Sequence, residues 1–183
     1  MVDLTLGCWD LLPALSEADR TTIAQRLLLP SAALIHKQTT QIHNIHSWHN
    51  AAVGLIGLVV GDAGMVDAAV DGPHGLEAQI AKGVLADGFW YEGSIGYHFY
   101  TVSSLRDFVT ALDARGRRVR GMDRFRRMFE APLDYACGDG ALPAINDGWA
   151  GGGLAGEAPA YEMAAHLWPA DPRIPAALAV FYR

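Results

Sequence analysis

The sequence has few cysteines, no long hydrophobic run and no strand-like alternation. Its two cysteines, Cys8 and Cys137, stand far apart and in no metal-binding spacing, so they indicate neither a disulfide framework nor a zinc site. The longest apolar run, residues 51–61, is too short to span a bilayer. Asp3 and the absence of a basic residue before Leu11 do not fit a signal peptide. We therefore expect no membrane partner, and the cellular compartment stays open.

Basic residues are scarce and unevenly placed. The net charge is −6, which disfavours a general binder of polyanions such as nucleic acid. Of the 14 lysines and arginines, seven are arginines within residues 115–127. We expect a solvated loop and helix start there, with a local patch for an anionic ligand as the alternative. Phe125 is the only aromatic residue among these arginines, which disfavours nucleic-acid binding further.

The chain does have a helical pattern throughout. Half of its 183 residues are hydrophobic, enough for a packed core. Helices are predicted over residues 16–29, 45–60, 66–85, 94–114, 122–129, 160–168 and 174–182. Ser16 should cap the first helix and Pro30 should end it, Gly72-Pro73 should break or bend the third, and Pro132 should stop the fifth. Helix pairs joined by glycine- and proline-rich loops predict an all-α array.

Two polar segments stand out because they concentrate aromatic and imidazole side chains. They are QIHNIHSWHN, residues 41–50, and DGFWYEGSIGYHFY, residues 87–100. Together they hold four of the seven histidines and three of the six tyrosines. Such crowding of imidazole, phenol and carboxamide groups is typical of a site that moves protons.

Three histidines of the first segment, His43, His46 and His49, recur at every third residue. On a helix they spread over about 120°, which is awkward for ligands of one metal ion. They can instead be core or capping histidines with satisfied hydrogen bonds, or they can line a ligand cleft at the start of a helix. The spacing by itself leaves these three interpretations open.

In the second segment Ser94 is a candidate helix N-cap, and Tyr97 then lies in the first helical turn. The positive end of the helix dipole could lower the pKa of the Tyr97 phenol and suit it to acid–base work. The alternative is a core tyrosine on an i, i+3/i+4 stripe. The stripe consists of Tyr97, Tyr100, Thr101, Leu105, Phe108 and Leu112.

Three carboxylates, Asp87, Glu92 and Asp147, are the candidates for a glycoside hydrolase, which needs two of them beside the bond it cleaves. The alternative for Glu92 is that it organises its loop and favours the following helix N-terminus. Residues 146–148, Asn-Asp-Gly, predict a tight turn.

Three tryptophans, Trp48, Trp90 and Trp149, can stack on sugar rings, although each can equally belong to the core. With Glu92 they are the expected substrate-binding residues.

Three stretches together resemble the heparinase II/III-like and alginate lyase superfamily of polysaccharide lyases, with the oligoalginate lyases as the nearest branch. They are WHNAAVGLIGLVVGD (48–62), DGFWYEGSIGYHFY (87–100) and MFEAPLDYACGDGALPAINDG (128–148). The resemblance implies an incomplete (α/α) toroid of antiparallel helix pairs, forming one partial domain over residues 1–183. The family's remaining toroid helices and C-terminal β-sandwich are not found in the chain, and its last residues form an apolar helix. We therefore expect a fragment of a longer enzyme.

The resemblance also implies β-elimination on a uronate-containing glycan, such as alginate or a heparin-like polymer, with no metal or other cofactor. The C5 proton can be removed only when the neighbouring carboxylate is neutralised. By the resemblance Asn44 takes this role, with His43 or His46 beside it, and Tyr97 serves as base, acid or both. The family's Asn-Trp pair is replaced here by Asn44-Ile45, so all three neutralising candidates are kept.

The sequence thus predicts a lyase whose partner is an acidic polysaccharide. The alternatives are a glycan-binding or structural helical module without activity, and a toroid glycoside hydrolase. Oligomeric state is not indicated.

Overall fold

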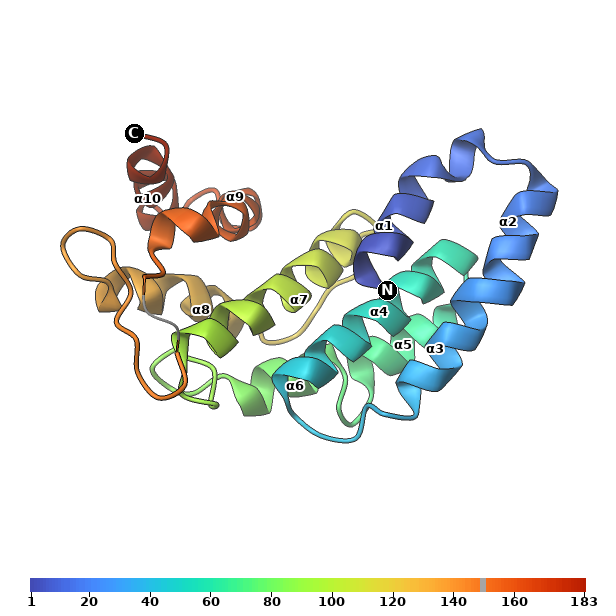
Figure 1. Ribbon diagram of the computed structural model, residues 1–183, viewed down its shortest axis with the longest axis horizontal. Helices are drawn as coiled ribbons and strands as arrows, with labels where there is room; N and C mark the ends of the chain where they lie inside the picture. Colours follow the sequence, from blue (N-terminus) through green and yellow to red (C-terminus); the bar gives the residue numbers. More distant parts are fainter. Residues whose placement is uncertain (149–150) are drawn as a thin grey trace. The chain divides into compact units, whose positions relative to one another are not determined.

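Every regular element in the described part of the chain is a helix (Figure 1). The structure, a computed structural model, describes residues 1–148 and 151–183, with only the backbone at positions 9, 10 and 12. The predicted all-α class is confirmed. The chain forms two compact units, one of residues 1–79 and 107–119 and the other of residues 80–106 and 120–183. No described helix is both long and apolar enough to cross a membrane.

The first unit is built around α4 (Asn44–Val60). Three helices pack against it: α1 (Val2–Leu11), α3 (Leu29–His36) and α5 (Ala63–Asp71) (Figure 1). The predicted apolar run forms the middle of α4, where residues 51–57 are all buried. The helix ends at Gly61, whose φ of 76° lies in the left-handed region that favours glycine. The prediction of a helix buried between others is confirmed.

The first predicted helix begins as expected but does not end at Pro30. The Ser16 side chain caps α2 (Glu17–Ile23) by accepting a hydrogen bond from the Asp19 N–H. A π-helical turn (Ala24–Leu28) then leads directly into α3, near whose start Pro30 lies. Proline has no N–H to donate to the carbonyl four residues earlier. A proline in the first turn of a new helical segment is tolerated because that bond is not required there.

The third predicted helix is two helices, α5 and α6 (Leu76–Gly83), and the break falls at residues 72–75 as Gly72-Pro73 indicated. The next helix, α7 (Ile95–Asp113), begins directly after Ser94. Its first residues, up to 106, belong to the second unit and the rest to the first.

The buried side of α7 differs from the predicted stripe at its start. Tyr97 and Tyr100 are 37% and 47% exposed, whereas His98 is fully buried. His98 therefore begins the buried stripe that Thr101, Leu105, Phe108 and Leu112 continue. Spacing alone allowed either Tyr97 or His98 to begin the stripe, because Thr101 stands four positions after the first and three after the second.

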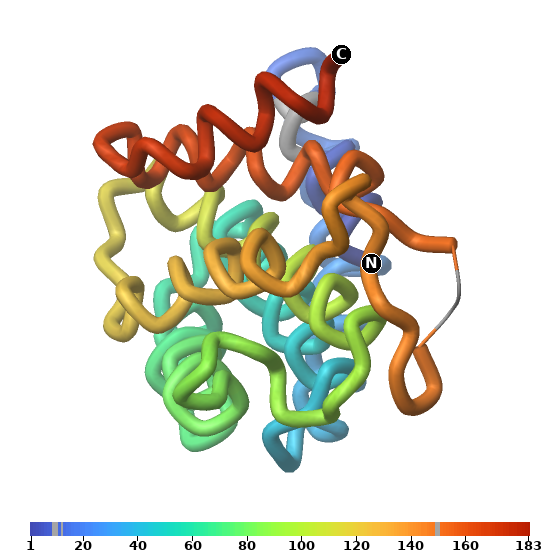
Figure 2. The backbone as a smooth tube through the Cα atoms, turned by 90° about the vertical axis from the view of Figure 1, so that its left-hand side faces the viewer, coloured from blue at the N-terminus to red at the C-terminus, as the bar shows by residue number. Residues whose placement is uncertain are grey.

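The second unit has three further helices: α8 (Met122–Tyr135), α9 (Ala158–Leu167) and α10 (Arg173–Phe181). A short 3₁₀ turn, Leu154–Glu157, precedes α9, and α10 lies alongside α9 (Figure 2). Aromatic rings fill the space among them. The ring of Tyr161 meets Phe129 with centroids 5.9 Å apart and Phe181 with centroids 5.2 Å apart.

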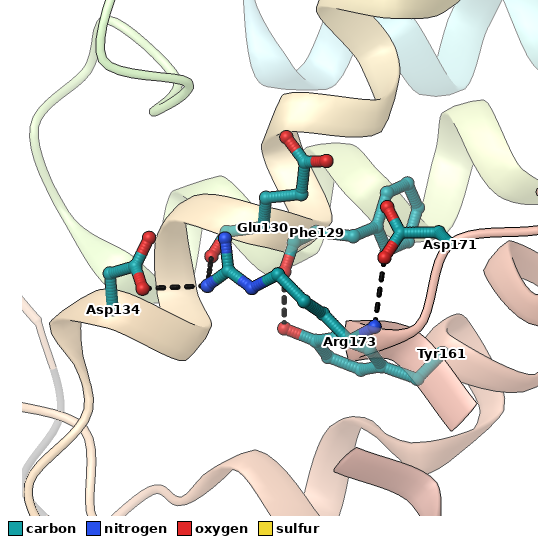
Figure 3. A network of polar contacts seen from close by, with 6 residues as sticks. All are labelled: Phe129, Glu130, Asp134, Tyr161, Asp171 and Arg173. Carbon is teal, nitrogen blue, oxygen red and sulfur yellow. Dashed lines mark hydrogen bonds and ion pairs between the residues drawn. The ribbon is translucent and has the colours of Figure 1, made fainter. Parts of the chain in front are cut away.

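Pro132 lies inside α8 and does not stop it, contrary to the prediction. The proline deprives the Met128 carbonyl, four residues earlier, of its usual amide donor. His98 supplies a substitute, because its Nε2 lies 2.9 Å from the Met128 oxygen. The Tyr161 hydroxyl donates to the neighbouring Phe129 carbonyl at 2.9 Å (Figure 3). Side-chain donors from two other helices thus satisfy the carbonyls around Pro132 and allow α8 to continue.

Arg173 joins the start of α10 to α8 (Figure 3). Its guanidinium donates to the Asp134 carboxylate at 2.6 Å and to the Glu130 carbonyl at 3.5 Å. Its own N–H donates to Asp171 at 2.9 Å. These groups are exposed, so we expect them to set the approach of the two helices more than to add stability.

Candidate functional site

The first polar segment forms the start of α4. His43 is the N-cap, and its Nδ1 accepts a hydrogen bond from the Ile45 N–H at 3.2 Å. The Nδ1 of His46 lies 3.1 Å from both the backbone nitrogen and the carbonyl oxygen of Gln41. Asn44 is buried in the first turn, with 4% of its surface exposed. The capping interpretation is confirmed for His43, while the catalytic roles of the three residues stay predictions.

The three histidines form a row along α4. The rings of His43 and His46 have centroids 5.6 Å apart, and those of His46 and His49 stack with centroids 5.3 Å apart. Burial, and secondarily the charge that His46 can carry, lower the pKa of His49. In the part of the chain that the structure describes, no group of three or more His, Cys, Asp or Glu residues is placed to hold a metal ion.

A buried glutamine that sequence reasoning missed organises this segment. Gln79 is 0% exposed. Its Oε1 accepts hydrogen bonds from the His43 N–H at 3.2 Å and the Ser47 hydroxyl at 3.3 Å. Its Nε2 donates to the carbonyls of Gln41 at 3.1 Å and His74 at 3.0 Å. No local pattern could reveal this role, because three of the four partners, His43, Ser47 and Gln41, are more than 30 residues away in the chain.

Replacing Gln79 with leucine is expected to lower the free energy of unfolding by about 3 kcal/mol, because it leaves buried polar partners unsatisfied. Gln38→Leu is the matched control, since Gln38 is exposed in the turn that follows α3. The control should change stability by less than about 0.5 kcal/mol. Urea unfolding followed by circular dichroism measures both, and equal stability of the two variants would contradict the role assigned to Gln79.

The second polar segment begins with a tight loop held against α8. The Leu85 N–H donates to the Phe89 carbonyl at 2.8 Å, and the Asp87 carboxylate accepts the Phe89 N–H at 3.0 Å. Gly88 has a φ of 93°, and a Cβ there would lie 2.6 Å from the Arg127 carbonyl oxygen. Only glycine combines this conformation with so close an approach.

Trp90 follows this loop and is a core residue. The residue is only 1% exposed, which favours its core interpretation over stacking on a sugar ring. Its Nε1–H donates to the Glu92 carboxylate at 2.5 Å. Glu92 therefore organises its loop, as one of its two interpretations predicted. Trp48 is partly exposed, and Trp149 lies outside the described residues.

Tyr97 presents a neutral phenol at the start of α7. The Asp147 carboxylate accepts a hydrogen bond from the Tyr97 hydroxyl. This bond raises the pKa of Tyr97, with smaller contributions from the Asp147 charge, burial and Glu92. The prediction of a lowered pKa is wrong, because the Asp147 carboxylate, which accepts the phenolic hydrogen bond, favours the protonated form. The resting side chain can therefore donate a proton.

Asp147 reaches Tyr97 because the turn that contains Asp147 is hydrogen-bonded to Gly93, just before the start of α7. The Gly148 N–H donates to the Ile145 carbonyl at 2.9 Å, which confirms the predicted tight turn. Asn146 has a φ of 52°, and its Nδ2 donates to the Gly93 carbonyl at 2.6 Å. Sequence reasoning named Asp147 only as a hydrolase carboxylate, and the pairing with Tyr97 depends on contacts between residues far apart in the chain.

The comparison with protein families bears on both polar segments. A family model described as alginate lyase matches residues 12–137, more than half of the chain. The chain belongs to the alginate lyase family. Among curated proteins, no sequence matches it. The resemblance to alginate lyases is thereby confirmed, and family membership indicates a lyase that acts on an acidic polysaccharide.

Arginines of the stretch 115–127 form ion pairs and hydrogen bonds with other residues of the chain. Arg117 pairs with Asp67 at 3.1 Å and Asp71 at 2.7 Å. Arg126 pairs with Glu130 at 3.3 Å. Arg124 donates to the backbone carbonyl of Ala81. These contacts favour the solvated loop and helix start over a patch for an anionic ligand.

A cavity in the second unit of the alginate lyase family member lies beside the second segment. Its volume is about 350 Å³, and its walls include Leu85, Phe89, Ile95 and Ile145. Among the described residues that line it, Asp87 is the only aspartate, glutamate, lysine, arginine or histidine. A uronate would find mostly apolar surface and a like charge there. The cavity therefore does not fit an acidic polysaccharide.

Proposed function

We propose that the chain cleaves alginate, or a closely related uronate polymer such as a heparin-like glycan, by β-elimination. The observation that carries the proposal is the alginate lyase match, which includes both polar segments. Each segment offers one of the two kinds of group that the reaction needs. We further propose that the helices are part of an (α/α) toroid in a longer enzyme.

The first requirement is a donor for the uronate carboxylate. In the uncatalysed state this carboxylate is charged, and its charge makes the neighbouring C5 proton very weakly acidic. Asn44, His43 and His46 are the proposed donors, since an amide N–H or an imidazole N–H can bind the carboxylate and stabilise the enolate-like state. Residues 37–61 contain no aspartate or glutamate, so a uronate meets no like charge from this stretch.

The second requirement is a group that moves the proton. Tyr97 is 37% exposed, and nearby carboxylates raise the pKa of its hydroxyl further above neutral pH, so the phenol keeps its proton. We assign to it the proton transfer between C5 and the leaving O4 oxygen. Trp48, which is partly exposed, and Glu92 remain proposed substrate contacts.

The direct test is to incubate the chain with polymannuronate, polyguluronate and a heparin-like polymer, and to follow the ultraviolet absorbance of a new C4=C5 double bond. Absorbance should rise together with new reducing ends for at least one polymer. Reducing ends without absorbance would assign the chain to the glycoside hydrolases instead. Binding of an oligouronate with neither product would indicate a glycan-binding module.

A further inference from the structure

Asp147 is held beside Tyr97 by contacts that do not involve Tyr97 itself. The turn of residues 145–148 closes through its own backbone hydrogen bond and is attached to Gly93 through Asn146 at 2.6 Å. Gly93 lies at the entry of α7, four residues before Tyr97. The turn therefore holds the Asp147 carboxylate beside the Tyr97 phenol, although the two residues are far apart in the chain. Asp147 is an exposed residue.

We propose that Asp147 is a positioning residue for Tyr97, one that holds the hydroxyl by its hydrogen bond and accepts the phenolic proton while Tyr97 removes the C5 proton. This inference rests on the proposed function. A phenol that keeps its own proton cannot act as a base. A carboxylate already bonded to the hydroxyl gives that proton a place to go.

The step balances without any co-reactant. The C5–H bond breaks, its proton moves to the Tyr97 oxygen, and the original phenolic proton passes along the existing hydrogen bond to the Asp147 carboxylate. The C5–H electron pair becomes the C4=C5 double bond, and the C4–O4 bond breaks. The O4 oxygen takes a proton from the Tyr97 hydroxyl, and Asp147 returns its proton to Tyr97. Both residues end in their starting states.

Among the described residues, two carboxylates act on the Tyr97 phenol, those of Asp147 and Glu92. Glu92 is bonded to the Trp90 indole at 2.5 Å, and Asp147 accepts the Tyr97 hydrogen bond, so only Asp147 is joined to the phenol in the way the step requires. Asparagine at position 147 would keep an oxygen that accepts this hydrogen bond but could not take up a proton. Asp147→Asn therefore removes proton uptake by residue 147 while it keeps the acceptor that positions the Tyr97 hydroxyl.

The experiment compares Asp147→Asn with Asp139→Asn, an exposed aspartate of the same glycine-rich region whose carboxylate accepts the Ala141 N–H at 3.0 Å. We expect Asp147→Asn to lower kcat for double-bond formation about 100-fold, with KM changed by less than about threefold. The control should keep full activity. A second readout is the ultraviolet titration of Tyr97, isolated by subtracting the titration of Tyr97→Phe. Its midpoint should move to lower pH in Asp147→Asn, because the charge that favours the neutral phenol is gone.

The possible outcomes distinguish a failure of the proposed function from a failure of the role assigned to Asp147. A wild-type chain that forms no double bond with any uronate polymer rejects the proposed function, and the inference with it. An active wild type with an equally active Asp147→Asn overturns the inference alone. An unmoved Tyr97 titration overturns it as well, whatever the activity.

Discussion

Substituting Tyr97 by phenylalanine is expected to lower kcat for double-bond formation about 1,000-fold, within the range that positioned acid–base groups contribute. The change removes only the hydroxyl, and the ring is partly exposed, so packing should be unaffected. KM should stay nearly constant, since the hydroxyl acts on a proton that moves only in the transition state. Steady-state kinetics on an oligouronate, read by ultraviolet absorbance, measure both constants.

Tyr100→Phe is the matched control for this prediction. Tyr100 lies one turn further along the same helix and is 47% exposed, so its variant should retain the wild-type rate. Full activity in Tyr97→Phe would reject the assigned mechanism. The double variant of Tyr97→Phe and Asp147→Asn adds a further check. If Asp147 acts only through Tyr97, the double variant should be no slower than Tyr97→Phe alone.

Acidification is expected to destabilise the fold through His98, by up to about 3 kcal/mol between pH 6.5 and pH 4. His98 is fully buried, and desolvation lowers its pKa from 6.5 to about 4. Its Nδ1 accepts the Trp90 N–H at 3.1 Å, so the neutral ring must carry its proton on Nε2, where it donates to Met128. Protonation of Nδ1 would break the bond to Trp90.

The direction of the change in stability follows from the pH at which His98 takes up its proton in the unfolded and in the folded state. Between pH 6.5 and pH 4 the unfolded chain has a protonated His98, whereas the folded chain keeps it neutral. The unfolded state therefore binds more protons, and stability is lost as the pH falls through this window. Above pH 6.5 both states are neutral at this residue, and its contribution is constant.

Urea unfolding at a series of pH values tests this with His98→Gln. The variant should be about 2 kcal/mol less stable than wild type at neutral pH, because a buried hydrogen bond is lost. It should also lack the part of the acid destabilisation that His98 causes. His166→Gln, at an exposed position of α9, should follow the wild-type profile. A wild-type pH slope in His98→Gln would contradict the assignment.

Local patterns predicted those features that depend on neighbouring residues. Ser16 caps α2, the apolar run after Asn50 is a buried helix, Gly72-Pro73 separates two helices, and α7 starts after Ser94. Each of these depends on backbone geometry or on hydrophobic periodicity within a few turns. The same patterns failed at Pro132, because the donors that allow α8 to continue come from His98 and Tyr161.

The sequence by itself determined the helical class, the family and the two polar segments, because periodicity and short motifs are properties of adjacent residues. Only the tertiary structure decided what several residues in those segments do. It buried Trp90, brought Gln79 to the cap of α4, and placed Asp147 on Tyr97, where it raises the pKa of the phenol. Burial and charge act through space, so such effects depend on which distant residues the fold brings together.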